Sequence, residues 1–313
     1  MRKGLVGILL GMFVMSSASA FATTVQSQFF SGLQQWSDNS AEYLLNYNPT
    51  AGTYSADDGD TIIATGDKLR GLFDIQTIED LTGVLPDRLV ATGGVNQFTG
   101  IFEADVIVGG GPGAYTFNLT PSASFQAIYG TGAMLALYQS PTLNYTRLGG
   151  TDDIPGAAAE EALIATATHD GAAFLVFGFK DWANLNYTFG EGWFSTSPTN
   201  DIALVGAIPP PGNGGTVNFA LNLLSTTLTG YDFNQVGTSF GAGGVYNPFA
   251  GGTAQLAGST NLLGTAGVVT PFNVFDNTDL VVNVEQVPEP GTIALLGLGL
   301  IGIGVYSRRR VKK

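Results

Sequence analysis

The chain of 313 residues contains no cysteine and one histidine, His169. Without cysteine there can be no disulfide framework, no thiolate metal site and no cysteine nucleophile. A single histidine also cannot build a multi-histidine metal centre. Gly237–Gly241 has the G-x-S-x-G spacing around Ser239, but His169 precedes that serine, whereas the α/β-hydrolase order places the histidine last. We find no catalytic constellation and expect the chain not to be an enzyme.

Basic residues are scarce as well. There are 12 Lys and Arg against 25 Asp and Glu, which gives a formal net charge of −13. Seven of the basic residues lie in the two ends, at Arg2 and Lys3 and within 308–313, which leaves a charge of −20 between them. Such a body should repel nucleic acid and anionic lipid headgroups, so we expect no nucleic-acid partner.

Charged residues of both signs make up only 12% of the chain, whereas glycine is abundant at 44 residues. Short apolar or alternating runs broken by Gly, Asn, Asp and Pro are typical of all-β proteins. We therefore predict an all-β fold, with a single large, jelly-roll-like β-sandwich ectodomain over residues 23–286. Pro209–Gly215 is the best internal break in this body, and it reads either as a domain linker or as one long loop.

Several runs within the body have the period of strands. Predicted strands cover Thr61–Thr65, Lys68–Thr77, Phe98–Val108, Glu161–Thr168 and Ala172–Lys180, and Phe125–Tyr138 reads as two strands. His169-Asp170-Gly171 is predicted to be the hairpin turn between the last two single runs, with a helix over Ala157–Thr166 as the competing interpretation.

The first residues have the three parts of a secretory signal peptide, which we place at 1–22. Arg2 and Lys3 precede an apolar stretch, Gly4–Met15, which is too short to span a bilayer comfortably. Small residues then lead to Ala20 and Ala22, and cleavage after either of them fits the pattern. The sequence therefore predicts export through the inner membrane.

The other end has three parts in order. Pro288, Glu289 and Pro290 form an extended segment, because proline disfavours helix both at its own position and before it. The uncharged run 292–306 then precedes Arg308, Arg309 and Arg310. As a helix this run would be roughly 22 Å long, short of the ~30 Å hydrocarbon core. We predict a short transmembrane span over 292–306 that holds the chain transiently, with the arginines as a cytoplasmic basic anchor.

Val287-Pro288-Glu289-Pro290-Gly291, the apolar span and the arginines together resemble the PEP-CTERM sorting domain of Gram-negative bacteria, over residues 287–313. The resemblance implies that an exosortase, a membrane protease or transpeptidase, recognises Pro288, Glu289 and Pro290 and removes the tail. It also implies a cell surface or extracellular matrix location in bacteria that make exopolysaccharide, biofilm or flocs. The alternative is an ordinary membrane anchor behind a proline-rich stalk.

Other motifs suggest binding sites without defining one. Asp105–Ala114 matches a dinucleotide fingerprint, but the alternating Tyr115–Thr120 follows it where a helix would be needed, so we interpret it as a glycine-rich hairpin turn. Asp57, Asp58 and Asp60 could offer oxygens to Ca²⁺, although solvated turn residues are the simpler reading. No other cofactor is expected.

These observations leave two functions open for the body. The first is a structural or adhesive role in an exopolysaccharide, biofilm or floc matrix, without catalysis. The second is a secreted protein that binds or acts on polysaccharide, which could use Trp36, Trp182 and Trp193 to stack on sugar rings. The competing interpretation of the tryptophans is that at least two lie in the core.

Overall fold

The computed structural model describes 11 stretches of the chain: 29–55, 62–89, 97–140, 172–180, 193–197, 216–236, 239–240, 244–245, 254–261, 279–287 and 297–301. Within them the dominant element is the β-strand, as the composition predicts. The elements are β1 (Gly32–Asn48), β2 (Thr53–Ser55), β3 (Lys68–Asp80), β4 (Arg88–Leu89), β5 (Gln97–Gly111), β6 (Ala114–Pro121), α2 (Ala123–Tyr129), β7 (Ala133–Ser140), β8 (Leu175–Gly178), β9 (Trp193–Ser197), β10 (Thr216–Thr226), β11 (Tyr231–Asn234), β12 (Ser239–Phe240), β13 (Gly244–Val245), β14 (Leu256–Asn261) and β15 (Asp279–Gln286).

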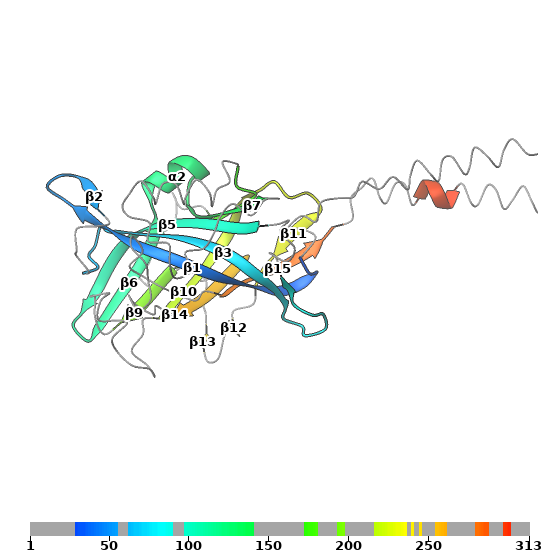
Figure 1. The fold of residues 1–313 in the computed structure, drawn as a ribbon, viewed down its shortest axis with the longest axis horizontal. Helices are drawn as coiled ribbons and strands as arrows, with labels where there is room; N and C mark the ends of the chain where they lie inside the picture. The colour runs from blue at the N-terminus through cyan, green and yellow to red at the C-terminus, as the bar shows by residue number, and fades with distance from the viewer. Residues whose placement is uncertain are drawn as a thin grey trace, which may run out of the picture.

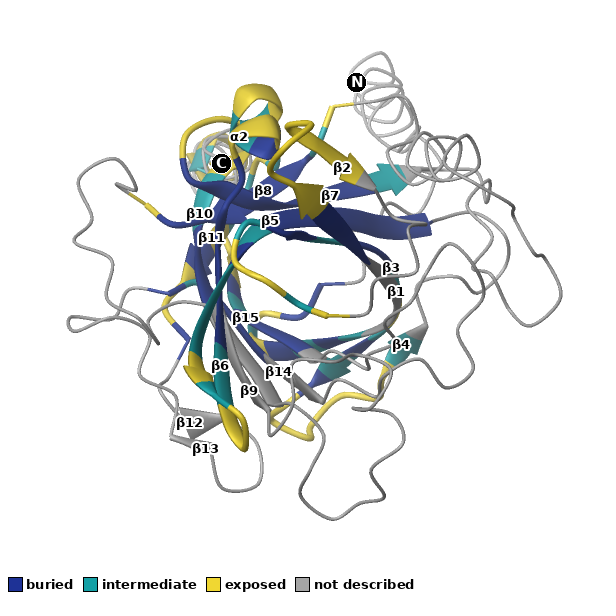
Figure 2. Ribbon diagram, turned by 90° about the vertical axis from the view of Figure 1, so that its left-hand side faces the viewer, coloured by how far each residue is buried: buried dark blue, intermediate teal, exposed yellow. Residues whose placement is uncertain are grey.

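Eight strands close the main sheet into an antiparallel barrel (Figures 1 and 2). The ring runs β3–β1–β15–β14–β10–β8–β7–β5 and returns to β3, because β3 pairs with β1 on one edge and with β5 on the other. Five further strands, β2, β4, β6, β9 and β11, extend it. The predicted all-β class is confirmed, but the predicted jelly-roll-like sandwich is wrong. Long twisted strands such as β1, with 17 residues, pair along both edges, so one sheet curls round and closes on itself.

Two strands of the ring, β5 and β10, each pair with one neighbour along one half of their length and with a different neighbour along the other half. β5 pairs with β7 through Gln97–Phe102 and with β6 through Ala104–Gly111. β10 likewise pairs with β8 through Asn222–Thr226 and with β9 through Thr216–Asn218. The ring therefore continues from β5 to β10 through β7 and β8 in one half and through β6 and β9 in the other. Helix α2 makes the connection between the halves, from β6 to β7.

One apolar cluster fills the barrel, and it takes side chains from all eight strands of the ring. Trp36 of β1 is completely buried at its centre. The Phe29 ring stacks on Trp36 with centroids 5.3 Å apart, and the Phe98 ring meets it edge-on at 5.1 Å. Phe233 of β11 makes a third ring contact, at 6.5 Å. Trp36 is therefore a core residue and is not exposed for sugar stacking.

Helix α2 covers part of the outer face of the barrel. Ser122 caps it, accepting a hydrogen bond from the Phe125 amide at 3.2 Å, and Gly130 ends it at a positive φ of 101°. Phe125 packs against outward-facing residues of the wall, including Ile101 and Tyr138. The prediction of two strands over Phe125–Tyr138 is therefore wrong in its first half, which is helical, and right in its second half, which is β7.

Of the other predicted strands, three are confirmed in whole or in part, one is wrong and one lies outside the described residues. Lys68–Thr77 and Phe98–Val108 are confirmed as β3 and β5, and Ala172–Lys180 contains β8. The predicted strand over Thr61–Thr65 is wrong, because Ile62 makes an isolated bridge and the chain then turns. Glu161–Thr168 lies outside the described residues, as do its proposed turn and Pro209–Gly215.

The described residues include no helix with the length and apolar character to cross a membrane. Of the predicted span over 292–306, the structure describes 297–301, which are helical. The described part therefore does not show the transmembrane helix expected over 292–306, and 292–296 and 302–306 lie outside the described residues.

Gly178 of β8 occupies a position in the wall that has no room for a side chain. A Cβ atom there would lie 2.0 Å from the carbonyl oxygen of Gly132, which itself accepts the Phe179 N–H at 2.9 Å. Gly178→Ala should therefore lower the free energy of unfolding by about 1–3 kcal/mol, because backbone must move to admit the methyl group. Gly111→Ala is the matched control, since nothing lies within 4 Å of its added Cβ. Urea unfolding of both variants measures the difference, and equal midpoints would contradict the packing described.

Candidate functional site

The barrel remains ordered by hydrogen bonds up to the first residue of the predicted sorting motif. Strand β15 pairs with β11 as far as Gln286, opposite Tyr231. The amide of Val287 then donates to the Gly230 carbonyl at 2.9 Å. Pro288 is the next residue, so no linker separates the folded body from the motif.

The described chain enters the barrel at the end from which this tail leaves. Gly32, at the start of β1, pairs with Val284 near the end of β15. Just before it, the Phe29 carbonyl accepts a hydrogen bond from Arg88 at 3.2 Å, and the Arg88 guanidinium lies 4.1 Å from the centre of the Phe30 ring. β1 then runs away from the tail, and its far end carries the β1–β2 hairpin at the opposite end of the molecule (Figure 1).

Most of the residues predicted to act in export and sorting fall outside the described part of the chain. These are the cleavage candidates Ala20 and Ala22, the motif residues Pro288, Glu289 and Pro290, and the basic anchor Arg308, Arg309 and Arg310. Asp57, Asp58 and Asp60, the weak calcium candidates, also lie outside it. Among the described residues, no group of three or more His, Cys, Asp or Glu side chains is placed to hold a metal ion.

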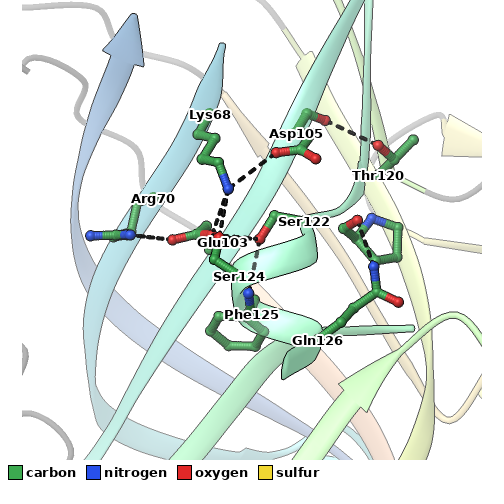
Figure 3. Close-up of polar contacts among 10 residues, drawn as sticks. Lys68, Arg70, Glu103, Asp105, Thr120, Ser122, Ser124, Phe125 and Gln126 are labelled. Atoms are coloured by element: carbon green, nitrogen blue, oxygen red, sulfur yellow. Dashed lines mark hydrogen bonds and ion pairs between the residues drawn. The ribbon is translucent and has the colours of Figure 1, made fainter. Parts of the chain in front are cut away.

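The structure does assemble one buried charged cluster that the sequence analysis did not predict. We define the Glu103 cluster as Lys68 and Arg70 of β3, Glu103 and Asp105 of β5, and Ser122 and Ser124 at the start of α2 (Figure 3). Arg70 is directly opposite Glu103, and Lys68 directly opposite Asp105, in the β3–β5 ladder. All four side chains point outward. Their neighbours on β5, Phe102, Ala104 and Val106, belong to the interior cluster, and successive side chains of a strand point to opposite faces.

Glu103 is the centre of this cluster and is only 3% exposed. It accepts from Lys68 Nζ at 3.1 Å, from Arg70 Nε at 2.7 Å and from Ser122 Oγ at 2.5 Å. It also accepts from Ser124 Oγ and from a second nitrogen of Arg70. Lys68 in turn lies 3.4 Å from Asp105. Two cations and two carboxylates thus neutralise one another beneath α2.

The electrostatics of the two carboxylates differ. Burial by itself would raise the pKa of Glu103, but the charge of Arg70 and the hydroxyls of Ser122 and Ser124 outweigh it and hold that pKa at about 2. Burial raises the pKa of Asp105, and the nearby Lys68 only partly opposes this. Glu103 therefore stays ionised and fully engaged, which suits it to fastening α2 to the barrel rather than to exchanging protons with a substrate.

The sequence contains one signal for this cluster. Lys68 and Arg70 are two of only five basic residues between the charged ends, and they are spaced two apart on a predicted strand. Glu103 and Asp105 have the same spacing on another. Alternation puts each pair on one face of its strand, but pairing and register across 33 residues of sequence could not be read from the pattern.

The motifs that resembled enzyme sites take up ordinary β structure. The glycine-rich stretch is the β5–β6 hairpin, in which Gly110 and Gly113 have positive φ angles of 73° and 91°. This confirms the hairpin interpretation. Ser239 lies in β12 and pairs with Val245 of β13, so the described residues here form an antiparallel strand pair, whereas a nucleophile elbow joins a strand to a helix. Trp193 is in β9, and Trp182 lies outside the described residues.

Comparison with known proteins identifies the tail alone. Residues 286–310 match the family model of the PEP-CTERM protein-sorting motif, which confirms the resemblance in this segment. No curated protein and no solved structure matches the chain.

Proposed function

We propose that this PEP-CTERM-bearing chain is a structural or adhesive component of an extracellular matrix of exopolysaccharide, biofilm or floc. Its motif marks it as an exported protein that an exosortase sorts to the cell surface or beyond. In the proposed sequence of events, the chain is held briefly at the inner membrane, the exosortase acts at Pro288–Pro290, and the barrel is delivered without the arginine tail.

The observation that carries this proposal is the junction between barrel and motif. Val287 makes the last hydrogen bond of the β11–β15 region, and the matched segment begins at 286. Processing beyond Val287 would therefore leave the barrel and its core intact. A compact antiparallel barrel whose buried charged side chains are paired with one another, as in the Glu103 cluster, suits a passive structural part.

Deletion of the gene tests the matrix role. We expect weaker floc cohesion and surface attachment, restored by a plasmid that supplies the wild-type chain. A chain with alanine at Pro288, Glu289 and Pro290 is the matched control, since it should fold but not be sorted, and it should fail to restore cohesion. Cohesion, attachment and matrix composition that do not change on deletion would contradict the proposal.

A further inference from the structure

The end of the barrel farthest from the tail presents two exposed aromatic side chains. Tyr47, near the end of β1, is directly opposite Tyr54 of β2 in a short hairpin that projects beyond the barrel (Figure 1). The two residues are 39% and 41% exposed, and their ring centroids lie 5.2 Å apart with the ring planes at 43°. Large aromatic side chains gathered in this way at a surface indicate a contact site more often than single exposed apolar residues do.

Both tyrosines are held in place by the residues beneath them. The Asp67 carboxylate, which is buried, accepts the Tyr47 amide at 2.9 Å and the Ala64 amide at 2.6 Å. The Tyr47 ring packs over Gly66, where an added Cβ would come within 3.3 Å of it. Lys68 places its ammonium 4.9 Å from the centre of the Tyr54 ring. Rings fixed before binding lose little conformational freedom when a ligand arrives.

We propose that Tyr47 and Tyr54 form a stacking site for a neutral polysaccharide. The face of an aromatic ring is electron-rich and attracts the weakly positive C–H groups on the face of a sugar, while a phenol hydroxyl can exchange hydrogen bonds with sugar hydroxyls. A tyrosine phenol is protonated at neutral pH, and partial burial raises the pKa of Tyr54 further. Two rings about 5 Å apart offer a sugar chain a small apolar platform with polar tips.

The charges around the site decide against an anionic ligand. Lys68 is the cation beside Tyr54, but it already contacts Glu103 at 3.1 Å and Asp105 at 3.4 Å. The chain between its charged ends carries −20, which repels polyanions such as uronic-acid polymers. A neutral glycan avoids this repulsion and still gains the stacking contacts.

The position of the site fits a protein delivered by its tail. Gly32 pairs with Val284 beside the tail, and Tyr47 lies 15 positions further along β1. At about 3.3 Å per residue, the strand path between them is roughly 50 Å. The tyrosines therefore lie at the end of the barrel far from its junction with the motif. At that end matrix polysaccharide could reach them.

Native electrophoresis of the purified full chain through gels that contain a soluble polysaccharide tests the site. Hydroxyethyl cellulose, galactomannan and dextran serve as neutral probes, and alginate as the anionic one. We expect at least one neutral polymer to retard the wild-type chain and alginate not to retard it. Tyr47→Ala/Tyr54→Ala should weaken the apparent affinity by about tenfold or more, whereas Tyr47→Phe/Tyr54→Phe, which keeps both rings, should retain most of it.

Val84→Ala/Ile128→Ala is the matched control, because it removes two side chains that are 78% and 72% exposed elsewhere on the surface. It should migrate as the wild type does. If the double alanine variant unfolds, Tyr54→Ser alone, on a strand of three residues, supplies the same comparison. Unchanged migration of the wild type in all three neutral polymers would overturn the proposal. So would retardation by alginate alone, or equal retardation of the alanine and wild-type chains.

The glycan site gains its biological purpose from the proposed matrix role, but the gel assay does not depend on it. Purified protein that binds a neutral polysaccharide while deletion leaves floc cohesion unchanged would reject the matrix role and keep the site. The reverse pair of results would reject the site and keep the role.

Discussion

A chain with Pro288, Glu289 and Pro290 replaced by alanine should escape exosortase processing and accumulate in the inner-membrane fraction with Arg308–Arg310 still attached. The matched motif spans 286–310, and the sequence predicts that these three residues are its extended, proline-bounded part, since proline disfavours helix at and before its own position. Alanine removes the glutamate side chain and permits helix where the prolines oppose it. Cell fractionation followed by immunoblotting measures the change, and we expect nearly all of the protein to shift from the surface or medium to the membrane.

Glu285→Ala is the matched control for that experiment. Glu285 is an exposed acidic residue on β15, two positions before Val287, and lies outside the matched segment. Its variant should be sorted as the wild type is. Normal release of the triple-alanine chain would instead show that the motif is not read, and that the tail acts as an ordinary anchor.

Glu103→Gln should strongly destabilise the barrel. It removes one of two carboxylates that balance Lys68 and Arg70, and it puts an amide N–H₂ among donors that need an acceptor. Breaking a buried ion pair in this way costs about 3–5 kcal/mol. For a domain of this size, that should lower the melting temperature by on the order of 10 °C.

Asp87→Asn is the matched control, because it removes the same charge from an exposed residue and should change the melting temperature little. A double variant, Arg70→Met/Glu103→Gln, should lose less stability than the sum of its single variants, since it removes both partners of the pair. An Arg70→Met/Glu103→Gln chain that loses the full sum would indicate that the two side chains act independently.

The same cluster predicts how stability depends on pH. The pKa of Glu103 is depressed to about 2 in the folded barrel from an ordinary value of 4.5, so its stabilising contribution is present above pH 4.5 and disappears as the pH falls towards 2. Asp105 has a raised pKa and acts in the opposite sense over the acid range. Acid should therefore destabilise the wild type more than Glu103→Gln, and parallel curves for the two chains would contradict the assignment.

The sequence predicted some of this fold and missed the rest for identifiable reasons. β3 and β5 were predictable because apolar and polar residues alternate along them. The closure of the sheet into a barrel was not predictable, because it depends on which strands pair. β3 pairs with β5 as well as with β1, and the local pattern of β3 would be the same in a barrel or a sandwich. Helix α2 was mistaken for a strand because its seven residues are too few to establish a helical period.

Some candidate functional residues could likewise be predicted from the sequence, and others could not. The sorting motif could be recognised because it is defined by the order of proline, glutamate and arginine along the chain, and a sequence displays that order directly. The two surface tyrosines and the Glu103 cluster depend on register between distant strands, such as the pairing of Tyr47 with Tyr54 and of Arg70 with Glu103. Trp36 shows that residue type alone can mislead. Tryptophan is suited to sugar stacking, but Trp36 lies at the centre of the core.

If an exosortase removes the tail of this chain, the C-terminus of the mature protein will show the cut. The protein should be isolated from the cell surface or matrix of the native organism and its C-terminal peptide identified by mass spectrometry. We expect that peptide to end within or beside Pro288–Pro290, with the apolar run and Arg308–Arg310 gone. A surface protein that still carries those arginines would contradict the account.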